Sequence, residues 1–560
     1  MNKMHKYIFT LIALSLASIK LPAQPSAVQK TGKAVITITT FSSDGNIISS
    51  SKGVFVGTNG EVISAWKPFV GAARATVIDA NGRQSEVAEI IGANELYDVC
   101  KFRINATGTP AKLATAPLSQ GEKVWLVGYA LKKPEIKELT VKSVESFMNQ
   151  YAYYIFPEAT DASLQSCPMV NDNGQVIGLS QQADASAEVH AVDARYPNSF
   201  TQTSGLAIND PLLSQTHIRK ALPDTKDQAT LALIMAGQQA DSLLYAQTID
   251  AFIRQFPNEI DGYTAKAATY IGSNISAADQ QMQLALKNVT AKDVVHSEYA
   301  KLIYQQQIYH PDTLNTTWTL DKALAEAETA WQLNPLPIYR HQQAQIIYSK
   351  GQYQQAYDMF IALAEAQQLG SEPYLEAAQC KTQLQAPHEE VIALLDKAIE
   401  TSPKPLTNVS APYFLARGQA YDAAGEYRKA IRDYNQYDTL MLGRAAPEFY
   451  YIKYQCEVKA RQYQQAISDI AHAALLNPNE PTYLAELASL NLKVNRLDDA
   501  IKAADLCMRI APSYPDAYIV KALALIHKGD KAAGLQILEQ ALPLNDDRIQ
   551  PLIDKYKTTH

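Results

Sequence analysis

The pattern of hydrophobic and polar residues divides this chain into two parts. From about residue 33 to 210, β-branched and other apolar residues alternate with polar ones in short runs such as KAVITITTF, KVWLVGYAL and GQVIGLSQ. The tripeptides TNG, ANG and DNG interrupt these runs, as the turns of β-hairpins do. Many short strands at this spacing predict a β-barrel or a β-sandwich.

After about residue 223 the alternation ends, and Ala, Leu, Gln and Tyr recur at helical spacing. A small residue then returns at one point of a repeated pattern. It is Ala430 in YRKAIRDY, Ala466 in YQQAISDI and Ala500 in LDDAIKAA, at nearly equal intervals. Gly534 follows Ala500 at the same interval that separates Ala500 from Ala466. This repetition predicts a series of helical hairpins.

A proline follows the small residue after twelve positions in three units. These are Pro335 in LNPLP after Ala323, Pro478 in LNPNE after Ala466, and Pro512 in IAPSY after Ala500. A proline at this point ends the second helix of a hairpin and turns the chain into the next one. Over 225–560 the arrangement resembles the tetratricopeptide repeat, a helix-turn-helix unit of about 34 residues. We expect about nine hairpins, with an irregularity near 280–320.

The resemblance to the tetratricopeptide repeat implies an all-α solenoid with a concave groove. Such a groove binds a peptide or a helix of a partner protein. We therefore expect a protein or peptide partner for this half of the chain, and no chemistry of its own.

Composition and charge narrow the function classes. A chain of 560 residues is too long for a single core. With 47% hydrophobic and 19% charged residues it contains enough apolar material to fold nearly throughout. The net charge of -7 is spread along the chain without a basic run, so we expect no nucleic-acid partner.

The first residues, MNKMHKYIFTLIALSLASIKLPAQ, combine a basic start, an apolar run and small residues before Gln24. This pattern predicts a signal peptide over 1–23 and export to the periplasm or the medium. The apolar run is shorter than the roughly 20 residues of a membrane-spanning helix. We expect no transmembrane segment in the mature chain. The sequence does not determine the oligomeric state.

The five cysteines are scattered, odd in number and without a C-x-x-C spacing, and the ten histidines are dispersed. They predict neither a disulfide framework nor a metal site. We expect no cofactor.

Residues 33–222 contain the segments SSKGVFVGTNGEVISAWKPFVGA and GANELYDVCKFRI. On these segments the region resembles the trypsin-like domain of the exported high-temperature-requirement proteases, which implies an all-β double barrel with the active site between the barrels. The first segment is similar to the family's histidine segment and has Lys67 at the histidine position. The segment GANELYDVCKFRI is similar to the aspartate segment and has Asp98 at the aspartate position. The segments SQGEKVWLVGYA and TSGLAIND extend the resemblance along the domain.

The nucleophile motif departs from the family. Where the family reads Gly-x-Ser-Gly-Gly-Pro, this chain reads SLQSCP, with Gln165 at the nucleophile and Ser163 at the first glycine. An amide is not a nucleophile, and a lysine with a pKa of about 10.4 is a poor general base. The glycines that aim N–H groups at the oxyanion are also absent. We expect Lys67 and Asp98 to form an ion pair instead of a relay.

Three functions remain open. The first is a binding or scaffold protein with an inactive protease-like domain, which the missing triad favours. The second is a peptidase with Ser166 or Cys167 as a displaced nucleophile and Lys67 as base. The third is a purely structural assembly component. His190 and His217 match no catalytic position, and Cys167 is also typical of a small buried residue.

Overall fold

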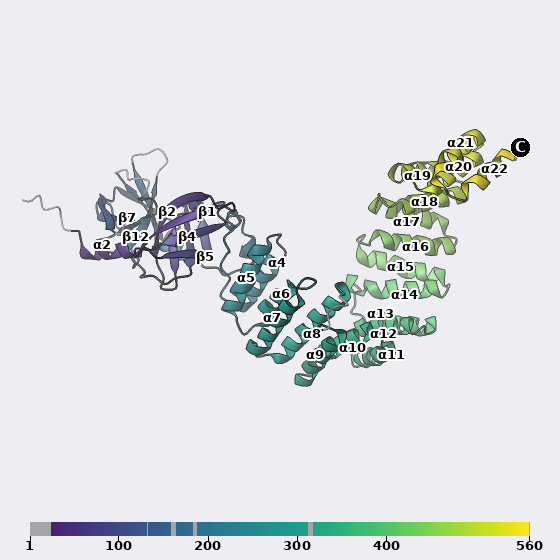
Figure 1. The fold of residues 1–560 in the computed structure, drawn as a ribbon, viewed down its shortest axis with the longest axis horizontal. Helices are drawn as coiled ribbons and strands as arrows, with labels where there is room; N and C mark the ends of the chain where they lie inside the picture. The colour runs from purple at the N-terminus through teal and green to yellow at the C-terminus, as the bar shows by residue number, and fades with distance from the viewer. Residues whose placement is uncertain (1–23, 131–132, 158–163, 183–187, 312–316, 559–560) are drawn as a thin grey trace, which may run out of the picture. The chain divides into compact units, whose positions relative to one another are not determined.

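The computed structural model describes residues 24–130, 133–157, 164–182, 188–311 and 317–558 (Figure 1). The predicted signal peptide, 1–23, lies outside this range. By its internal contacts the chain divides into two compact units, Met1–Thr290 and Ala291–His560. None of the described helices has both the length and the apolar character that are needed to cross a membrane.

The first unit begins with a closed antiparallel barrel in the order β1-β2-β3-β6-β5-β4. Alternate residues of each strand point inward, which is the arrangement that the period-two pattern predicts. Trp66, Phe69 and Phe102 are fully buried in its core. The strands are β1 (Val35–Phe41), β2 (Ile47–Phe55), β3 (Glu61–Ser64), β4 (Arg74–Ile78), β5 (Gln84–Asn94) and β6 (Val99–Ile104).

A second antiparallel sheet follows, in the order β8-β7-β11-β12-β13-β10-β9. Leu126, Phe156 and Met169 are buried in its own core. Two consecutive β units of this kind confirm the predicted trypsin-like β fold. The strands are β7 (Lys123–Ala130), β8 (Lys133–Thr140), β9 (Ser143–Phe147), β10 (Tyr151–Phe156), β11 (Pro168–Val170), β12 (Val176–Gln182) and β13 (Val189–Asp193).

Short helices occur before, within and after the β part. They are α2 (Ser26–Thr31), η1 (Gly32–Ala34), η2 (Lys67–Phe69), α3 (Arg195–Asn198), η4 (Gly205–Asn209) and η5 (Leu213–Gln215). The Thr31 hydroxyl donates a hydrogen bond of 2.7 Å to the Gly174 carbonyl, which attaches α2 to the turn before β12.

Four helices complete the first unit: α4 (Lys226–Gly237), α5 (Ser242–Gln255), α6 (Ile260–Ala268) and α7 (Ile275–Asn288). Ile208 and Leu222 pack with Phe252 of α5 in one apolar cluster. A Cβ on Gly205 would lie 2.3 Å from the Gln228 carbonyl oxygen of α4, so only glycine allows this close approach. The helices of this unit thus pack directly on the segment that follows the β part.

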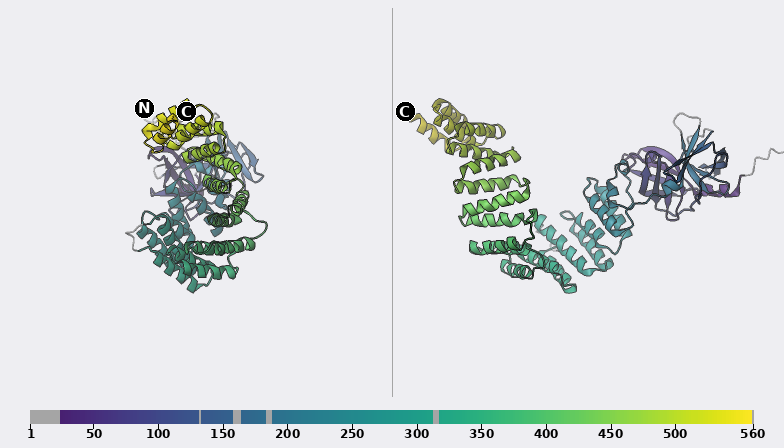
Figure 2. Two further views of the ribbon diagram at one scale, coloured as in Figure 1. Left: turned by 90° about the vertical axis from the view of Figure 1, so that its right-hand side faces the viewer. Right: turned by 180° about the vertical axis from the view of Figure 1, so that it is seen from behind.

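The second unit is all α, and each of its α-helices contacts the next one along the chain (Figures 1 and 2). The helices are α8 (Lys292–Tyr309), α9 (Leu320–Leu333), α10 (Pro337–Ser349), α11 (Tyr353–Glu365), α12 (Glu372–Gln383), α13 (His388–Thr401), η6 (Asn408–Ser410), α14 (Ala411–Ala423), α15 (Tyr427–Met441), α16 (Pro447–Lys459), α17 (Tyr463–Leu476), α18 (Pro481–Lys493), α19 (Leu497–Ile510), α20 (Pro515–His527), α21 (Lys531–Ala541), η7 (Leu542–Leu544) and α22 (Ile549–Thr558).

The small residues of the repeated pattern lie where neighbouring helices meet. Ala430, Ala466 and Ala500 are fully buried, on α15, α17 and α19. A Cβ on Gly418 of α14 would lie 2.6 Å from the ring of Tyr434 on α15. The small residues recur in the sequence because each hairpin needs a small side chain where its two helices pack closely.

Candidate functional site

Lys67 and Asp98 lie together at one end of the first barrel. Lys67 begins η2 shortly after β3 and is exposed, while Asp98 is half-buried in the turn before β6. Oδ1 of Asp98 accepts the backbone N–H of Trp66 at 3.0 Å and that of Lys67 at 2.7 Å. Within the described residues, no ion pair joins the Lys67 amine to Asp98. The aspartate holds the main chain of the lysine loop.

The Gln165 loop is fastened to β12 by its neighbours. The Ser166 N–H donates to the Ser180 carbonyl at 2.8 Å, and the Ser180 hydroxyl donates to the Leu164 carbonyl at 2.6 Å. The Ser180 N–H in turn donates to the Cys167 carbonyl at 2.9 Å. Gln165 stands half-buried between these anchored residues. Ser163, at the first glycine position of the family motif, lies outside the described residues.

A chain of contacts connects the three predicted triad segments. Gln181, next to Ser180 on β12, donates its side-chain N–H to the carbonyl of Tyr97. Tyr97 precedes Asp98, which binds the backbone of Lys67. These contacts connect the aspartate turn both to the lysine loop and to β12, which also holds the glutamine loop. The convergence of the three side chains stays a prediction.

Ser166 and Cys167 lie inside the protein. Ser166 is 1% exposed, and its hydroxyl has no hydrogen-bond partner among the described residues. Cys167 is 0% exposed, and burial raises the pKa of its thiol to about 12. A buried thiol with this pKa is almost wholly protonated at neutral pH and is a weak nucleophile.

The turn at Ser166 has a backbone conformation that is typical of glycine. The missing glycines predict a different backbone here, but Ser166 has φ +63°, the left-handed conformation that glycine adopts without strain. The bond to Ser180 and the pairing of β11 with β12 hold the chain on both sides. Because of these restraints, the backbone keeps this conformation without a glycine.

Aromatic side chains surround the aspartate turn. The Tyr97 ring stacks on Phe147 with 4.3 Å between centroids and meets Tyr196 edge-on at 5.7 Å. His190 contacts the Tyr153 hydroxyl at 3.0 Å through Nδ1. His217 follows η5, where its N–H donates to the Ala72 carbonyl. These contacts give neither histidine a bond to Asp98 or to the Gln165 loop within the described residues.

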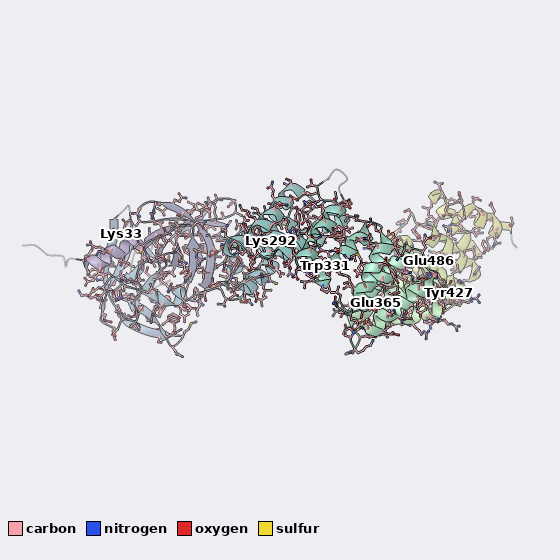
Figure 3. The ribbon with its side chains drawn as sticks, turned by 90° about the horizontal axis from the view of Figure 1, so that it is seen from below. Lys33, Lys292, Trp331, Glu365, Tyr427 and Glu486 are labelled. Carbon is pink, nitrogen blue, oxygen red and sulfur yellow. The ribbon has the colours of Figure 1, made fainter. Side chains whose placement is uncertain are left out.

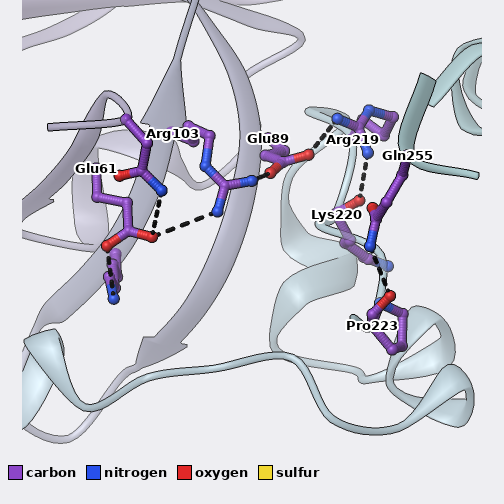
Figure 4. A network of polar contacts seen from close by, with 9 residues as sticks. Glu61, Glu89, Arg103, Arg219, Lys220, Pro223 and Gln255 are labelled. Atoms are coloured by element: carbon purple, nitrogen blue, oxygen red, sulfur yellow. Dashed lines mark hydrogen bonds and ion pairs between the residues drawn. The ribbon is translucent and has the colours of Figure 1, made fainter. Parts of the chain in front are cut away.

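A network of charged side chains on the first barrel was not singled out in the sequence (Figure 4). Arg103 contacts both Glu61 and Glu89, and Glu89 also contacts Arg219, which precedes α4. Charged residues at alternate positions of a strand predict a face exposed to solvent. The sequence pattern therefore does not predict that these residues form a network. The signal that could have found it is the pair Lys101 and Arg103, two charges at alternate positions of one strand.

A buried acid occurs in the second unit. Glu457 of α16 is 1% exposed, and burial together with the charge of Asp469 raises its pKa to about 8. The neighbouring Lys453 amine pairs with Asp469 at 3.0 Å. The raised pKa of Glu457 therefore favours its protonated form. Across the described ranges, no group of three or more His, Cys, Asp or Glu side chains is arranged to hold a metal ion.

No protein-family model and no curated protein sequence matches this chain. Solved structures that resemble it include the Rv3671c protease in an inactive form, at 15% identity and a TM-score of 0.27, covering 31% of this chain and 91% of that one. Another is a serine endoprotease from Yersinia pestis, at 17% identity and a TM-score of 0.27, covering 34% of this chain and 65% of that one. Likeness at this level carries no conclusion on activity, and the fold assignment rests on the strand topology.

Proposed function

We propose that this chain is an exported binding or scaffold protein. Its trypsin-like domain does not hydrolyse peptides, and its helices are tetratricopeptide repeats that bind a peptide or protein partner. The observation that carries this proposal is the environment of Gln165, Ser166 and Cys167. An amide stands at the nucleophile position, and the two neighbouring nucleophilic side chains are buried.

The remaining groups at the site do not supply the serine-protease mechanism. That mechanism needs a nucleophile hydrogen-bonded to a base, and a carboxylate that orients the base. Asp98 directs its carboxylate to two backbone N–H groups, and the position of the base holds an exposed lysine in place of a histidine. Each missing group lowers the rate by orders of magnitude.

The helical unit supports the binding role. A cavity of about 810 Å³ lies among α10, α12, α13 and α14, and its lining combines apolar residues such as Leu375 with the exposed amides of Gln379 and Gln419. Outside this cavity, Trp331 of α9 and Tyr427 of α15 have half-buried aromatic side chains that could also contact a partner (Figure 3). Amides beside apolar surface suit the backbone and side chains of a bound peptide.

The second candidate, a peptidase with a displaced nucleophile, requires Ser166 or Cys167 to reach a substrate carbonyl. Their burial and the raised pKa of Cys167 oppose this function. The third candidate, a purely structural component, requires that the cavity of the helical unit bind nothing.

One experiment separates the first two candidates. The mature protein is incubated with a fluorophosphonate and with iodoacetamide, and casein digestion is measured in parallel. We expect no labelling at Ser166 or Cys167 under native conditions and no digestion. Labelling that disappears in a Ser166→Ala, Cys167→Ala double variant, together with digestion that disappears with it, would establish the peptidase.

A second experiment separates binding from a purely structural role. Partners captured by the full mature chain are identified and compared with those captured by a Gln379→Arg, Gln419→Arg variant. We expect the variant to lose the partner, because two long cationic side chains fill the cavity. The control is Gln354→Arg, at an exposed position on α11 that does not line the cavity. Equal capture of a partner by all three proteins would place its binding outside this cavity, and capture of no partner by any of them would favour the structural role.

Export has its own test. N-terminal sequencing of the protein recovered from the periplasm or the medium should begin near Gln24. A chain that starts at Met1 and stays in the cytoplasm would contradict this part of the proposal.

A further inference from the structure

A cavity of about 440 Å³ lies in the first unit, outside the region of Lys67, Asp98 and Gln165. Strands β5 and β6 of the barrel form one side of it. The segment 219–224 and the end of α5 form the other side. The network of Figure 4 lines part of its wall, so its charged groups come from segments far apart in the sequence.

Two carboxylates in the wall are already neutralised. Glu61 contacts the Lys101 amine at 3.1 Å and the Arg103 guanidinium at 3.3 Å. Glu89, which is buried, contacts the guanidinium groups of Arg103 and Arg219. Three cations therefore surround these two carboxylates, with Arg103 shared between them. Neither carboxylate is left to neutralise another cation.

Arg254 is a cationic residue of the lining that has no carboxylate partner in this network. It lies on α5, lines the cavity and is exposed, and within the part of the chain that the structure describes it has no hydrogen bond or ion pair. Asp224, the remaining carboxylate of the lining, is also exposed. The lining thus has four cationic side chains against three carboxylates, an excess of one positive charge.

The positive charges are close enough to affect one another. Burial lowers the pKa of Arg219 against the opposing influence of Glu89, and the charges of Arg254 and Arg103 lower it further. Because the four cationic side chains of the lining outnumber its three carboxylates, an added anion would be stabilised there.

The rest of the lining mixes polar side chains, such as Gln202 and Gln255, with apolar ones. Ile91, Leu222 and Ala251 are buried, and Phe200 is half-buried beside them. A ligand that fills the cavity would place an apolar group against these side chains and a charged group toward Arg254.

We propose that this cavity binds a small monoanionic carboxylate that carries an apolar group, with Arg254 as its principal contact. A carboxylate matches the planar fork of a guanidinium and accepts two parallel hydrogen bonds from it. A single negative charge balances the single excess positive charge of the lining. A phosphate dianion would exceed that charge and face repulsion from Asp224.

The probes are N-acetyl-leucine and N-acetyl-leucinamide, which differ only in the carboxylate. Their binding to the full mature protein is measured by saturation-transfer NMR titration up to about 10 mM, since fragments of this size bind weakly. We expect the acid to bind and the amide to bind at least about tenfold more weakly, because it lacks the charge-assisted hydrogen bonds.

Two variants test the assigned residues. Arg254→Gln should weaken binding of the acid about five- to tenfold, and Asp224→Asn should strengthen it about two- to threefold by removing a competing charge. Arg83→Gln is the matched control, since Arg83 is an exposed arginine of the barrel that does not line the cavity. It should leave binding unchanged.

The result that overturns the proposal is equal binding of the acid and the amide, or no binding of the acid at the highest concentration. Inorganic phosphate binding in preference to the acid would also overturn it. The same holds if Arg254→Gln and Arg83→Gln have equal effects. The two proposals can fail independently, because the residues changed to test partner binding by the helical unit do not line this cavity.

Discussion

Asp98 binds the backbone of Lys67: its Oδ1 accepts the Lys67 N–H at 2.7 Å, while the lysine side chain is exposed. The expected ion pair between the two side chains is therefore absent from the contacts of the described residues, and a hydrogen bond to the main chain stands in its place. The contact joins the turn before β6 to the loop after β3.

This contact predicts a structural role for Asp98. Asp98→Ala should destabilise the first unit by about 1–3 kcal/mol, because the N–H groups of Trp66 and Lys67 lose a charged acceptor. Asp98→Asn should cost less, since its amide oxygen still accepts and asparagine tolerates the positive φ of this position. Urea denaturation of the mature protein measures both. Equal stability of Asp98→Ala and the parent would contradict this role.

Ser166 offers a stabilising substitution. Ser166→Gly should raise stability by about 0.5–1 kcal/mol, because glycine removes both the strain of φ +63° and the unpartnered buried hydroxyl. Ser166→Ala removes the hydroxyl but keeps the strain, and so should gain less. Thermal unfolding of the three proteins decides the order, and a destabilised Ser166→Gly would show that the serine makes a contact worth more than the strain.

Glu457 makes the stability of the second unit depend on pH. Its pKa is about 8 in the folded protein against an ordinary value of 4.5, so folding binds a proton. The resulting stabilisation is complete below about pH 4.5 and is lost as the pH rises through about 8. Glu457→Gln, which needs no proton, should flatten this decline and stabilise the unit by about 1–2 kcal/mol near pH 8.

Calorimetric scans at several pH values check the Glu457 prediction. Glu448→Gln is the control, since Glu448 is an exposed residue of the same helix. An unchanged pH dependence in Glu457→Gln would mean that the group does not take up a proton on folding.

His341 is a second residue that makes the stability of the second unit depend on pH. Burial lowers the pKa of His341, but its hydrogen bond to Glu376 and the charge of that carboxylate outweigh burial, so the pKa is raised above 6.5. The raised pKa contributes stability that is complete below the unfolded pKa and is lost as the pH rises through the folded one. Glu376→Gln should reverse the direction of the shift. NMR titration of the His341 ring measures it, and a pKa that stays above 6.5 in Glu376→Gln would contradict the assignment.

The order and the type of the elements can be predicted from the sequence. Alternation along KAVITITTF and KVWLVGYAL predicts strands, and the recurrence of Ala430, Ala466 and Ala500 predicts helical hairpins. These signals are local, because a strand or a helix buries residues at its own period whatever the rest of the chain does. The resemblance also predicts that Gln165 stands at the nucleophile position of the family motif, and this stays a prediction.

What the site residues contact depends on the tertiary structure. That Asp98 binds main-chain N–H groups, and that Ser166 is buried in a left-handed conformation, follows from the packing of turns against distant strands. The network from Glu61 through Arg103 and Glu89 to Arg219 likewise joins segments that lie far apart in the sequence. A charged residue on a strand has the same local pattern whether it meets solvent or a counter-ion. Its partner is set by the closure of the barrel and by the segments that pack beside it.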